Sequence, residues 1–266
     1  MLRFAVDSII ADRFFQILSA VNQEEHEATM PSMDCDQPEF YWIFRNIDFA
    51  QWKSASCSQA LWLSGPPECR IHQVSSSIVN RAKESALTKE HCVLHFFCST
   101  TVREKSVVSV FVQTLLYQII CSSPMDKKLI IRNFLKTLVE IILEKEGASN
   151  WEPARFEGSP EILLKRILNA SADGLWTALK AALSDDPGRE LLIVVDGLDK
   201  VQHQKCEFSK AIREFVAHLL ERTSKVKALL TSRPQAEIKE VLEGLPCIEY
   251  DKERKGLVAP YISTLS

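Results

Sequence analysis

The sequence predicts an α/β protein built on a parallel sheet of about five strands flanked by helices, with a helical lead-in at the N-terminus. From residue 60 onward, short apolar runs alternate with longer amphipathic segments, which is the pattern of parallel strands joined by crossover helices. The run LLIVV (191–195) is apolar at every position, as expected of a central strand covered on both faces.

The predicted elements follow in order along the chain. The expected strands are 60–64, 92–98, 191–195, 228–231 and 247–250. The expected helices are 6–22, 73–85, 107–121, 127–144, 173–184, 206–222 and 234–243. The segment 147–161 has no clear period and is expected to be an irregular insertion. The apolar faces of 107–121 and 127–144 favour core packing, with a surface for a partner as the alternative.

An aromatic cluster follows the polar linker that separates the first helix from the main domain. It consists of Tyr41, Trp42, Phe44, Phe49 and Trp52. Packing against the domain is the favoured interpretation, and a binding surface is the alternative.

Composition excludes two classes of partner. A formal net charge of −3 does not supply the positive charge on which binding to a nucleic-acid backbone depends. No apolar stretch is long enough to span a bilayer, so no membrane segment is expected. The eight cysteines lack the spacing of a disulfide framework, which predicts a reducing, cytoplasmic environment.

Three motifs occur in order: LWLSGPP leading into a helix, LLIVVDGLDK at 191–200 and ALLTSRP at 228–234. Together they resemble the NACHT class of P-loop NTPases, the ATPase module of NOD-like receptors and other STAND signalling proteins. The resemblance is strongest to the fungal form with a nephrocystin-3-like N-terminal domain. It implies a P-loop NTPase-like sheet and a nucleotide site that binds ATP or ADP with Mg²⁺.

The phosphate loop departs from the Walker A pattern of that family. An intact loop reads G-x-x-x-x-G-K-[ST], in which backbone amides surround the phosphates, Lys neutralises them and the hydroxyl binds Mg²⁺. The aligned residues are Gly65, Pro66, Pro67, Glu68, Cys69, Arg70, Ile71 and His72. Glycine is replaced at 68 and 70, the lysine is Ile71 and the hydroxyl residue is His72. The loop is therefore degenerate.

The second motif places Asp196 at the end of a buried strand, with Asp199 close behind it. The resemblance implies that Asp196 holds magnesium through water; the alternative is that Asp196 caps the strand exit and bonds nearby amides. Lys200 stands where the family has a glutamate that activates the attacking water, which predicts suppressed hydrolysis.

The third motif is intact, and Arg233 resembles the sensor arginine that contacts the terminal phosphate in relatives. In a site without nucleotide, Arg233 is expected to pair with Asp196 or Glu68 across the cleft.

Two weaker signals are interpreted structurally. In HCVLHFFC (91–98), the cysteines and histidines alternate between faces of a strand, which disfavours a shared metal ion. Cys69 and His72 have the types of a nucleophile and a base, but no third partner is visible.

The favoured function is a degenerate NACHT domain without NTPase activity, acting as a scaffold or as a truncated signalling-receptor module. The alternatives are a working ATP/ADP-dependent conformational switch and a nucleotide-independent protein-interaction module. Protein partners or self-association are expected, and no cofactor unless the site retains nucleotide binding. The expected segments are 1–57 as the lead-in, 58–252 as the domain and 253–266 as the start of a further helical region. A misannotated gene product would also account for the altered loop.

Overall fold

A computed structural model of the chain describes residues 12–19, 42–86, 91–98, 107–122, 130–137, 140, 172–184, 190–201, 205–221 and 225–250. The chain divides into two compact units. The helical unit comprises Met1–Ala28 and Thr101–Gly188, and the sheet unit comprises Thr29–Thr100 and Arg189–Ser266. The predicted insertion 147–161 and the predicted helical region 253–266 lie outside the described residues, as do the ends of the predicted helices 6–22 and 127–144.

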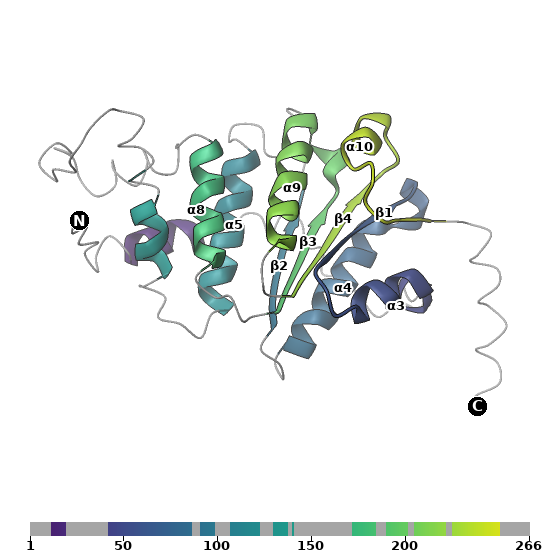
Figure 1. Cartoon of the computed structure of the whole chain (residues 1–266), viewed down its shortest axis with the longest axis horizontal. Coiled ribbons are helices and arrows are strands. Elements are labelled where there is room, and N and C mark those ends of the chain that lie inside the picture. The colour runs from purple at the N-terminus through teal and green to yellow at the C-terminus, as the bar shows by residue number, and fades with distance from the viewer. Residues whose placement is uncertain are drawn as a thin grey trace, which may run out of the picture. The chain divides into compact units, whose positions relative to one another are not determined.

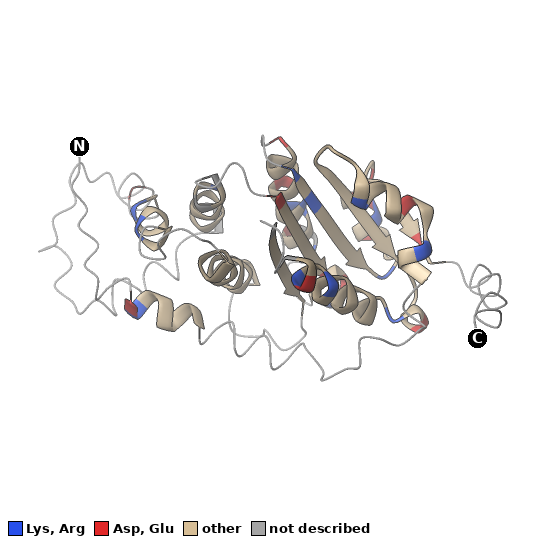
Figure 2. Ribbon diagram, turned by 90° about the horizontal axis from the view of Figure 1, so that it is seen from below, with Lys and Arg blue, Asp and Glu red and all other residues tan. Residues whose placement is uncertain are grey.

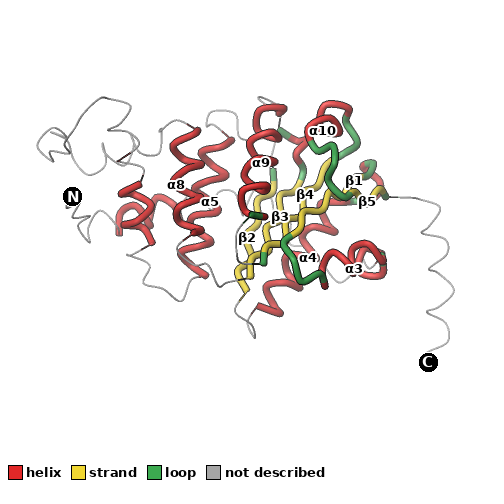
Figure 3. The backbone as a smooth tube through the Cα atoms, in the orientation of Figure 1, coloured by secondary structure: helices red, strands yellow, loops and turns green. Residues whose placement is uncertain are grey.

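The sheet unit contains a five-stranded sheet in which every pairing is parallel. The strand order is β2-β3-β4-β1-β5, so the first strand lies between the fourth and the fifth (Figures 1 and 3). All five predicted strands are confirmed, each with ends within two residues of those expected. The strands are β1 (Gln59–Ser64), β2 (His91–Phe97), β3 (Glu190–Asp196), β4 (Val226–Ser232) and β5 (Cys247–Glu249).

The order of the strands explains their composition. β4 is buried at all seven positions because it lies between β1 and β3 and is covered on both faces. β5, at one edge of the sheet, is only three residues long and buries only Ile248. The register of β1 pairs Leu61 with Leu229 on β4 and Leu63 with Ile248 on β5, which aligns apolar side chains across the sheet.

Helices cover both faces of the sheet, and charged residues are sparse on the strands between them (Figure 2). α3 (Ile47–Ser54) and α4 (Ile71–Ala86) pack on one face. On the other face α9 (Lys205–Leu220) packs through Phe208, whose ring centroid lies 6.4 Å from that of Phe96 on β2. The short helix α10 (Ala236–Val241) leads from β4 to β5 (Figure 1).

The aromatic lead-in packs against the sheet unit, as predicted. Asn46 caps α3 by accepting a hydrogen bond from the amide of Phe49, and the helix then buries Phe49 and Trp52. Before it, α2 (Trp42–Arg45) places the ring of Trp42 edge-on to Tyr250, with centroids 5.1 Å apart. The core on this face consists of Ile43, Phe49, Trp52, Leu61, Leu63, Val74, Ile78, Val79, Val93, Phe97, Val194, Leu229 and Ile248.

The helical unit contains helices at 12–19 and 130–137 together with α5 (Val107–Ser122) and α8 (Ala172–Ser184). Aromatic contacts join them: the ring of Phe14 stacks on that of Phe134 with centroids 5.9 Å apart, and the tilted rings of Phe111 and Trp176 lie 5.2 Å apart. Core packing of the predicted apolar face of α5 is confirmed by the burial of Val108, Phe111, Leu115 and Ile119. Within the residues described, no helix is long and apolar enough to cross a membrane.

Candidate functional site

The candidate site lies where β1, β3 and β4 end. Parallel strands bring their carboxyl ends to one edge of the sheet, and in open α/β sheets ligands bind in the crevice at that edge. The edge has a cavity of about 100 Å³. It is lined by Gly65, Pro66, Pro67, Arg70, Ile71, His72, Asp196, Gly197, Asp199, Lys200, Thr231, Ser232 and Arg233. The predicted site residues therefore lie around one cavity, apart from Glu68, which is exposed, and Cys69, whose thiol donates to the carbonyl of Pro66 at 2.8 Å.

The loop after β1 keeps a tight turn although its glycines are replaced. Pro67–Cys69 form one turn of 3₁₀ helix, and Arg70 then adopts a left-handed conformation, with φ 51° and ψ 44°, before α4 begins. Gly65 has no room for a side chain, because an added Cβ would lie 2.6 Å from the sulfur of Cys69 and 2.8 Å from the Cβ of Tyr250.

The amide groups of this loop are committed within the protein. Pro66 and Pro67 have no N–H to offer. The amides of Gly65, Cys69 and Arg70 donate to the carbonyls of Ser232, Pro66 and Pro67, at 3.4, 3.1 and 3.2 Å. Five of the six residues from 65 to 70 therefore either lack an N–H or use it internally, whereas a phosphate-binding loop directs such groups at its ligand.

Asp196, at the end of β3, is the centre of a buried polar network. Its side chain is 1% exposed. Oδ1 accepts hydrogen bonds from the hydroxyls of Ser75 and Thr231, both at 2.7 Å. Oδ2 lies 2.8 Å from Nδ1 of His72 and 3.5 Å from Nζ of Lys200. With an ionised carboxylate as acceptor, His72 must carry a proton on Nδ1 to make this bond. The alternative expectation was that Asp196 bonds nearby amides. In the described part of the chain, its carboxylate contacts side chains instead.

Two residues that depart from the expected pattern of the nucleotide site thus lie beside the carboxylate. His72 occupies the position of the loop hydroxyl, and Lys200 occupies that of the family's glutamate. Their nitrogens lie 3.5 Å from each other, both beside Oδ2 of Asp196. The positive charge of Lys200 therefore lies beside the carboxylate of Asp196.

Arg233 pairs with a different partner from those expected. Its amide donates to Oδ1 of Asp199 at 2.9 Å, and its Nε lies 3.4 Å from Oδ2 of the same residue. The expected pairing with Asp196 or Glu68 is wrong for a physical reason. The oxygens of Asp196 are occupied by the buried network, while the 3₁₀ turn Leu198–Lys200 directs Asp199 toward the end of β4.

The residues do not fit a magnesium–nucleotide complex in this arrangement. Both oxygens of Asp196 already accept hydrogen bonds, so the carboxylate has little capacity left for a cation or its waters. The cavity of about 100 Å³ is smaller than the roughly 300–1,000 Å³ of typical small-molecule pockets. Among the described residues there is also no group of three or more His, Cys, Asp or Glu side chains that could hold a metal ion.

The network sets the protonation of Asp196. Burial raises the pKa of its carboxyl, but the hydrogen bond from His72, the charges of Lys200 and His72 and the bond from Ser75 outweigh burial and hold the pKa below its usual value. A lowered pKa contributes stability that is present above the unfolded-state value of about 3.9 and is lost as the pH falls through the folded-state value.

Acidification should therefore weaken the fold through this residue. We expect the free energy of unfolding, measured by urea titration between pH 3 and 7, to fall below about pH 4. The Asp196→Asn variant should show a shallower fall over the same range, because it has no carboxyl at this position to protonate. Parallel curves for the two proteins would contradict the assignment.

The left-handed Arg70 supplies a second expectation. A left-handed conformation costs a residue with a Cβ about 1–2 kcal/mol, and glycine avoids this cost. Glycine also loses more conformational entropy on folding, which cancels about 0.5–1 kcal/mol of the stabilisation. Arg70→Gly should therefore raise the free energy of unfolding by about 0.5–1 kcal/mol in chemical denaturation. Arg70→Ala, which retains the strain, is the matched control. A less stable Arg70→Gly protein would show that the arginine side chain contributes more than its backbone conformation costs.

Sequence reasoning missed Ser75 and Thr231. Both are small hydroxyl residues of ordinary type, and neither occupies a position named by the phosphate-loop pattern. Their positions carried a usable signal, because Ser75 follows His72 by one helical turn on α4 and Thr231 lies near the end of β4, next to β3. Ser232 was missed in the same way; its hydroxyl accepts a bond from the indole of Trp62 at 3.0 Å.

Comparisons with known proteins bear on this geometry. No curated protein matches the chain. Among solved structures, the ORC1 protein of Aeropyrum pernix in complex with DNA matches with 13% identity and a TM-score of 0.36. The match covers 87% of this chain and 44% of that one, so this chain spans less than half of its length. A similarity this low supports no conclusion about activity.

A family match is more extensive. The family described as Nephrocystin 3, N-terminal, matches residues 40–233, which is well over half of the 266 residues. The matched segment includes the altered phosphate loop, Asp196 and Arg233. The chain belongs to the nephrocystin 3 N-terminal family.

Proposed function

We propose that this chain is a degenerate NACHT-type domain of the nephrocystin-3-like kind, which neither binds nor hydrolyses nucleotide and acts as a scaffold or receptor module in signalling. The observation that carries the proposal is the network at Asp196, in which His72 and Lys200 contact the carboxylate at 2.8 and 3.5 Å. A protein side chain supplies the charge that magnesium would supply in an active relative.

Loss of binding follows from the loop. Ile71 carries no charge where a P-loop lysine would neutralise the phosphates, and Glu68 adds a carboxylate to the same turn. Because Glu68 is exposed and does not line the cavity, solvent screens its repulsion, and the missing positive charge at Ile71 is the larger loss. The loop amides already donate to carbonyl groups of the protein, so they are not available to bind a phosphate.

Loss of hydrolysis follows from Lys200 and Arg233. A lysine cannot orient or activate the attacking water as the family's glutamate does, and positioning of the nucleophile is a large part of phosphoryl-transfer catalysis. The backbone amide and the guanidinium of Arg233 both contact Asp199, which fixes this side chain within the protein. Asp196, the remaining magnesium-binding candidate, is enclosed by hydrogen bonds.

The experiment compares the natural chain with a reverted protein. The reverted protein carries Glu68→Gly, Arg70→Gly, Ile71→Lys, His72→Ser and Lys200→Glu. Thermal unfolding is recorded with and without ATP or ADP and Mg²⁺. A ligand at a hundred times its dissociation constant adds about 2.7 kcal/mol, which is roughly 5–10 °C for a domain of this size. We expect this shift in the reverted protein and none in the natural chain.

The matched control carries the same changes except Ile71→Lys, so that it regains the loop backbone without the phosphate-neutralising charge. Its shift should be smaller than that of the full revertant. A shift of several degrees in the natural chain would overturn the proposal and favour the conformational-switch alternative.

The same proposal assigns protein partners or self-association in the cytoplasm, with no nucleic-acid partner. Family membership supports the protein partners, and the net charge of −3 disfavours a nucleic-acid partner. The scattered cysteines favour the reducing environment of the cytoplasm. Light scattering after gel filtration tests it. The measured mass should be the same with and without ATP and Mg²⁺, and a nucleotide-dependent change in mass would contradict it.

A further inference from the structure

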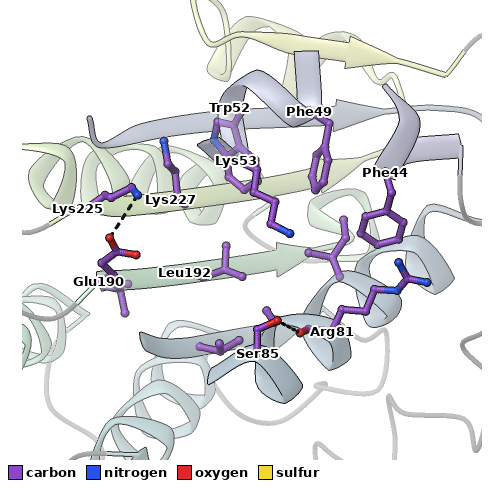
Figure 4. Close-up of a pocket in the computed structure, with 14 residues that line it drawn as sticks. Phe44, Phe49, Trp52, Lys53, Arg81, Ser85, Glu190, Leu192, Lys225 and Lys227 are labelled. Atoms are coloured by element: carbon purple, nitrogen blue, oxygen red, sulfur yellow. Dashed lines mark hydrogen bonds and ion pairs between the residues drawn. The ribbon is translucent and has the colours of Figure 1, made fainter. Parts of the chain in front are cut away.

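A second and larger cavity lies within the sheet unit, at the edge of the sheet opposite the Asp196 site. Its volume is about 300 Å³, at the lower end of the range of small-molecule pockets. It is bounded by α3, by the C-terminal half of α4 and by the amino-terminal ends of β2, β3 and β4 (Figure 4). Of its lining residues, only Leu191 and Leu192 belong to one of the three sequence motifs, and both are apolar residues of the β3 strand rather than predicted site residues.

One side of the cavity is apolar and aromatic. Phe44 and Phe49 meet edge to face with centroids 5.8 Å apart, and Phe49 lies 5.4 Å from Trp52. Ile78 on α4 and Leu192 on β3 extend the apolar lining. Such walls favour a flat ring or a branched alkyl group.

The remainder of the lining is strongly basic. Lys53, Arg81, Lys225 and Lys227 line the cavity against a single carboxylate, Glu190, which gives a formal excess of three positive charges. Glu190 pairs with Lys225, whose Nζ lies 3.3 Å from Oε1. One anion within the lining thus balances one of its four cations.

Lys227 is the least solvated of these cations. It is 8% exposed, and its Nζ donates at 2.8 Å to the carbonyl of Cys57, a neutral group. Burial and the charge of Lys225 lower its pKa, and Cys57 and Glu190 offset this only in part, so compensation for the lost solvent is incomplete. An anion bound nearby would provide that compensation.

Lys53 and Arg81 define the open side. Lys53 extends from α3 into the pocket (Figure 4) and has no ion-pair or hydrogen-bond partner in the described parts of the chain. The guanidinium of Arg81 lies over the ring of Phe44, 4.3 Å from its centroid, so its charge is held against the aromatic wall.

We propose that this cavity binds a small amphipathic organic anion, with an aromatic or branched apolar body against Phe44, Phe49 and Trp52 and an anionic head beside Lys53 and Lys227. At roughly 30 Å³ for a water-sized group, the volume holds on the order of ten such groups, which is too small for a nucleoside triphosphate. The site is independent of the Asp196 network, and its occupancy does not depend on the proposed loss of nucleotide binding.

The test uses two probes that differ only in charge. Isothermal titration calorimetry of the full chain is performed with 2-naphthoate and with its neutral counterpart 2-naphthamide. We expect the anion to bind about tenfold or more tightly than the amide, because only the anion gains the basic lining. Equal affinities, or no binding of either probe, would overturn the proposal.

Two variants then locate the binding. Lys53→Gln should reduce the preference for the anion about threefold or more, while Lys239→Gln on α10, outside the lining, should leave it unchanged. Ala82→Leu adds volume at a partly buried lining position and should weaken both probes about tenfold. An Ala82→Leu protein that is folded by circular dichroism and binds naphthoate as before would place the ligand elsewhere and contradict the assignment.

Discussion

Replacing Asp196 with alanine is expected to lower the free energy of unfolding by about 2–4 kcal/mol, because the buried carboxylate accepts several hydrogen bonds and each bond to a charged group contributes about 1.5–3 kcal/mol. The carboxylate is 1% exposed and accepts hydrogen bonds from Ser75, Thr231 and His72. Its removal takes this acceptor from Thr231 and His72, leaves the hydroxyl of Ser75 with the carbonyl of Ile71 at 3.1 Å, and removes the negative charge beside Lys200. Guanidinium titration monitored by circular dichroism measures the loss.

The control is an exposed carboxylate with a comparable ion pair. Glu249 pairs with Lys239 at 3.4 Å, and its side chain is 66% exposed. Glu249→Ala should therefore cost only about 0–1 kcal/mol. If Asp196→Ala is no more destabilising than Glu249→Ala, the network does not stabilise the fold.

Replacing Lys200 with glutamate should destabilise the natural chain by about 2–4 kcal/mol. The substitution turns an attraction at 3.5 Å from Asp196 into a repulsion, and charges about 4 Å apart interact by about 4 kcal/mol at an effective dielectric of 20. Lys200 is 32% exposed, so solvent screening reduces this figure.

Lys200→Met is the matched control, because it removes the charge without reversing it and keeps the length of the side chain. It should cost about 1 kcal/mol, and the difference between the two variants reports the repulsion. Equal stabilities, measured by denaturant titration at low ionic strength, would mean that Lys200 does not balance the charge of Asp196.

The strands could be predicted because each is a short apolar run flanked by polar residues. LLIVV predicted a central strand, and β3 is paired on both sides, by β2 and by β4. The order of the strands could not be read from the runs, because it depends on which helix crosses which neighbour. The first strand, for example, lies between the fourth and the fifth and not beside the second, which follows it in the sequence.

The site was predicted less completely. Most of the predicted site residues lie at the carboxyl edge, yet the predicted partner of Arg233 was wrong because the oxygens of Asp196 already accept hydrogen bonds from other side chains. Ser75 and Thr231 are of an ordinary residue type, so only their places on α4 and β4 could have indicated that they contact Asp196. The basic cavity was missed because it depends on the space that α3 leaves beside the sheet, whereas the sequence shows only the aromatic cluster.

The most direct test of the central claim is calorimetric titration of Mg²⁺-ATP into the natural chain. If His72 and Lys200 take the place of the metal at Asp196, no heat beyond dilution should appear at ligand concentrations up to about 1 mM, which corresponds to a binding free energy weaker than about −4 kcal/mol. Micromolar binding abolished by Asp196→Asn would contradict the account.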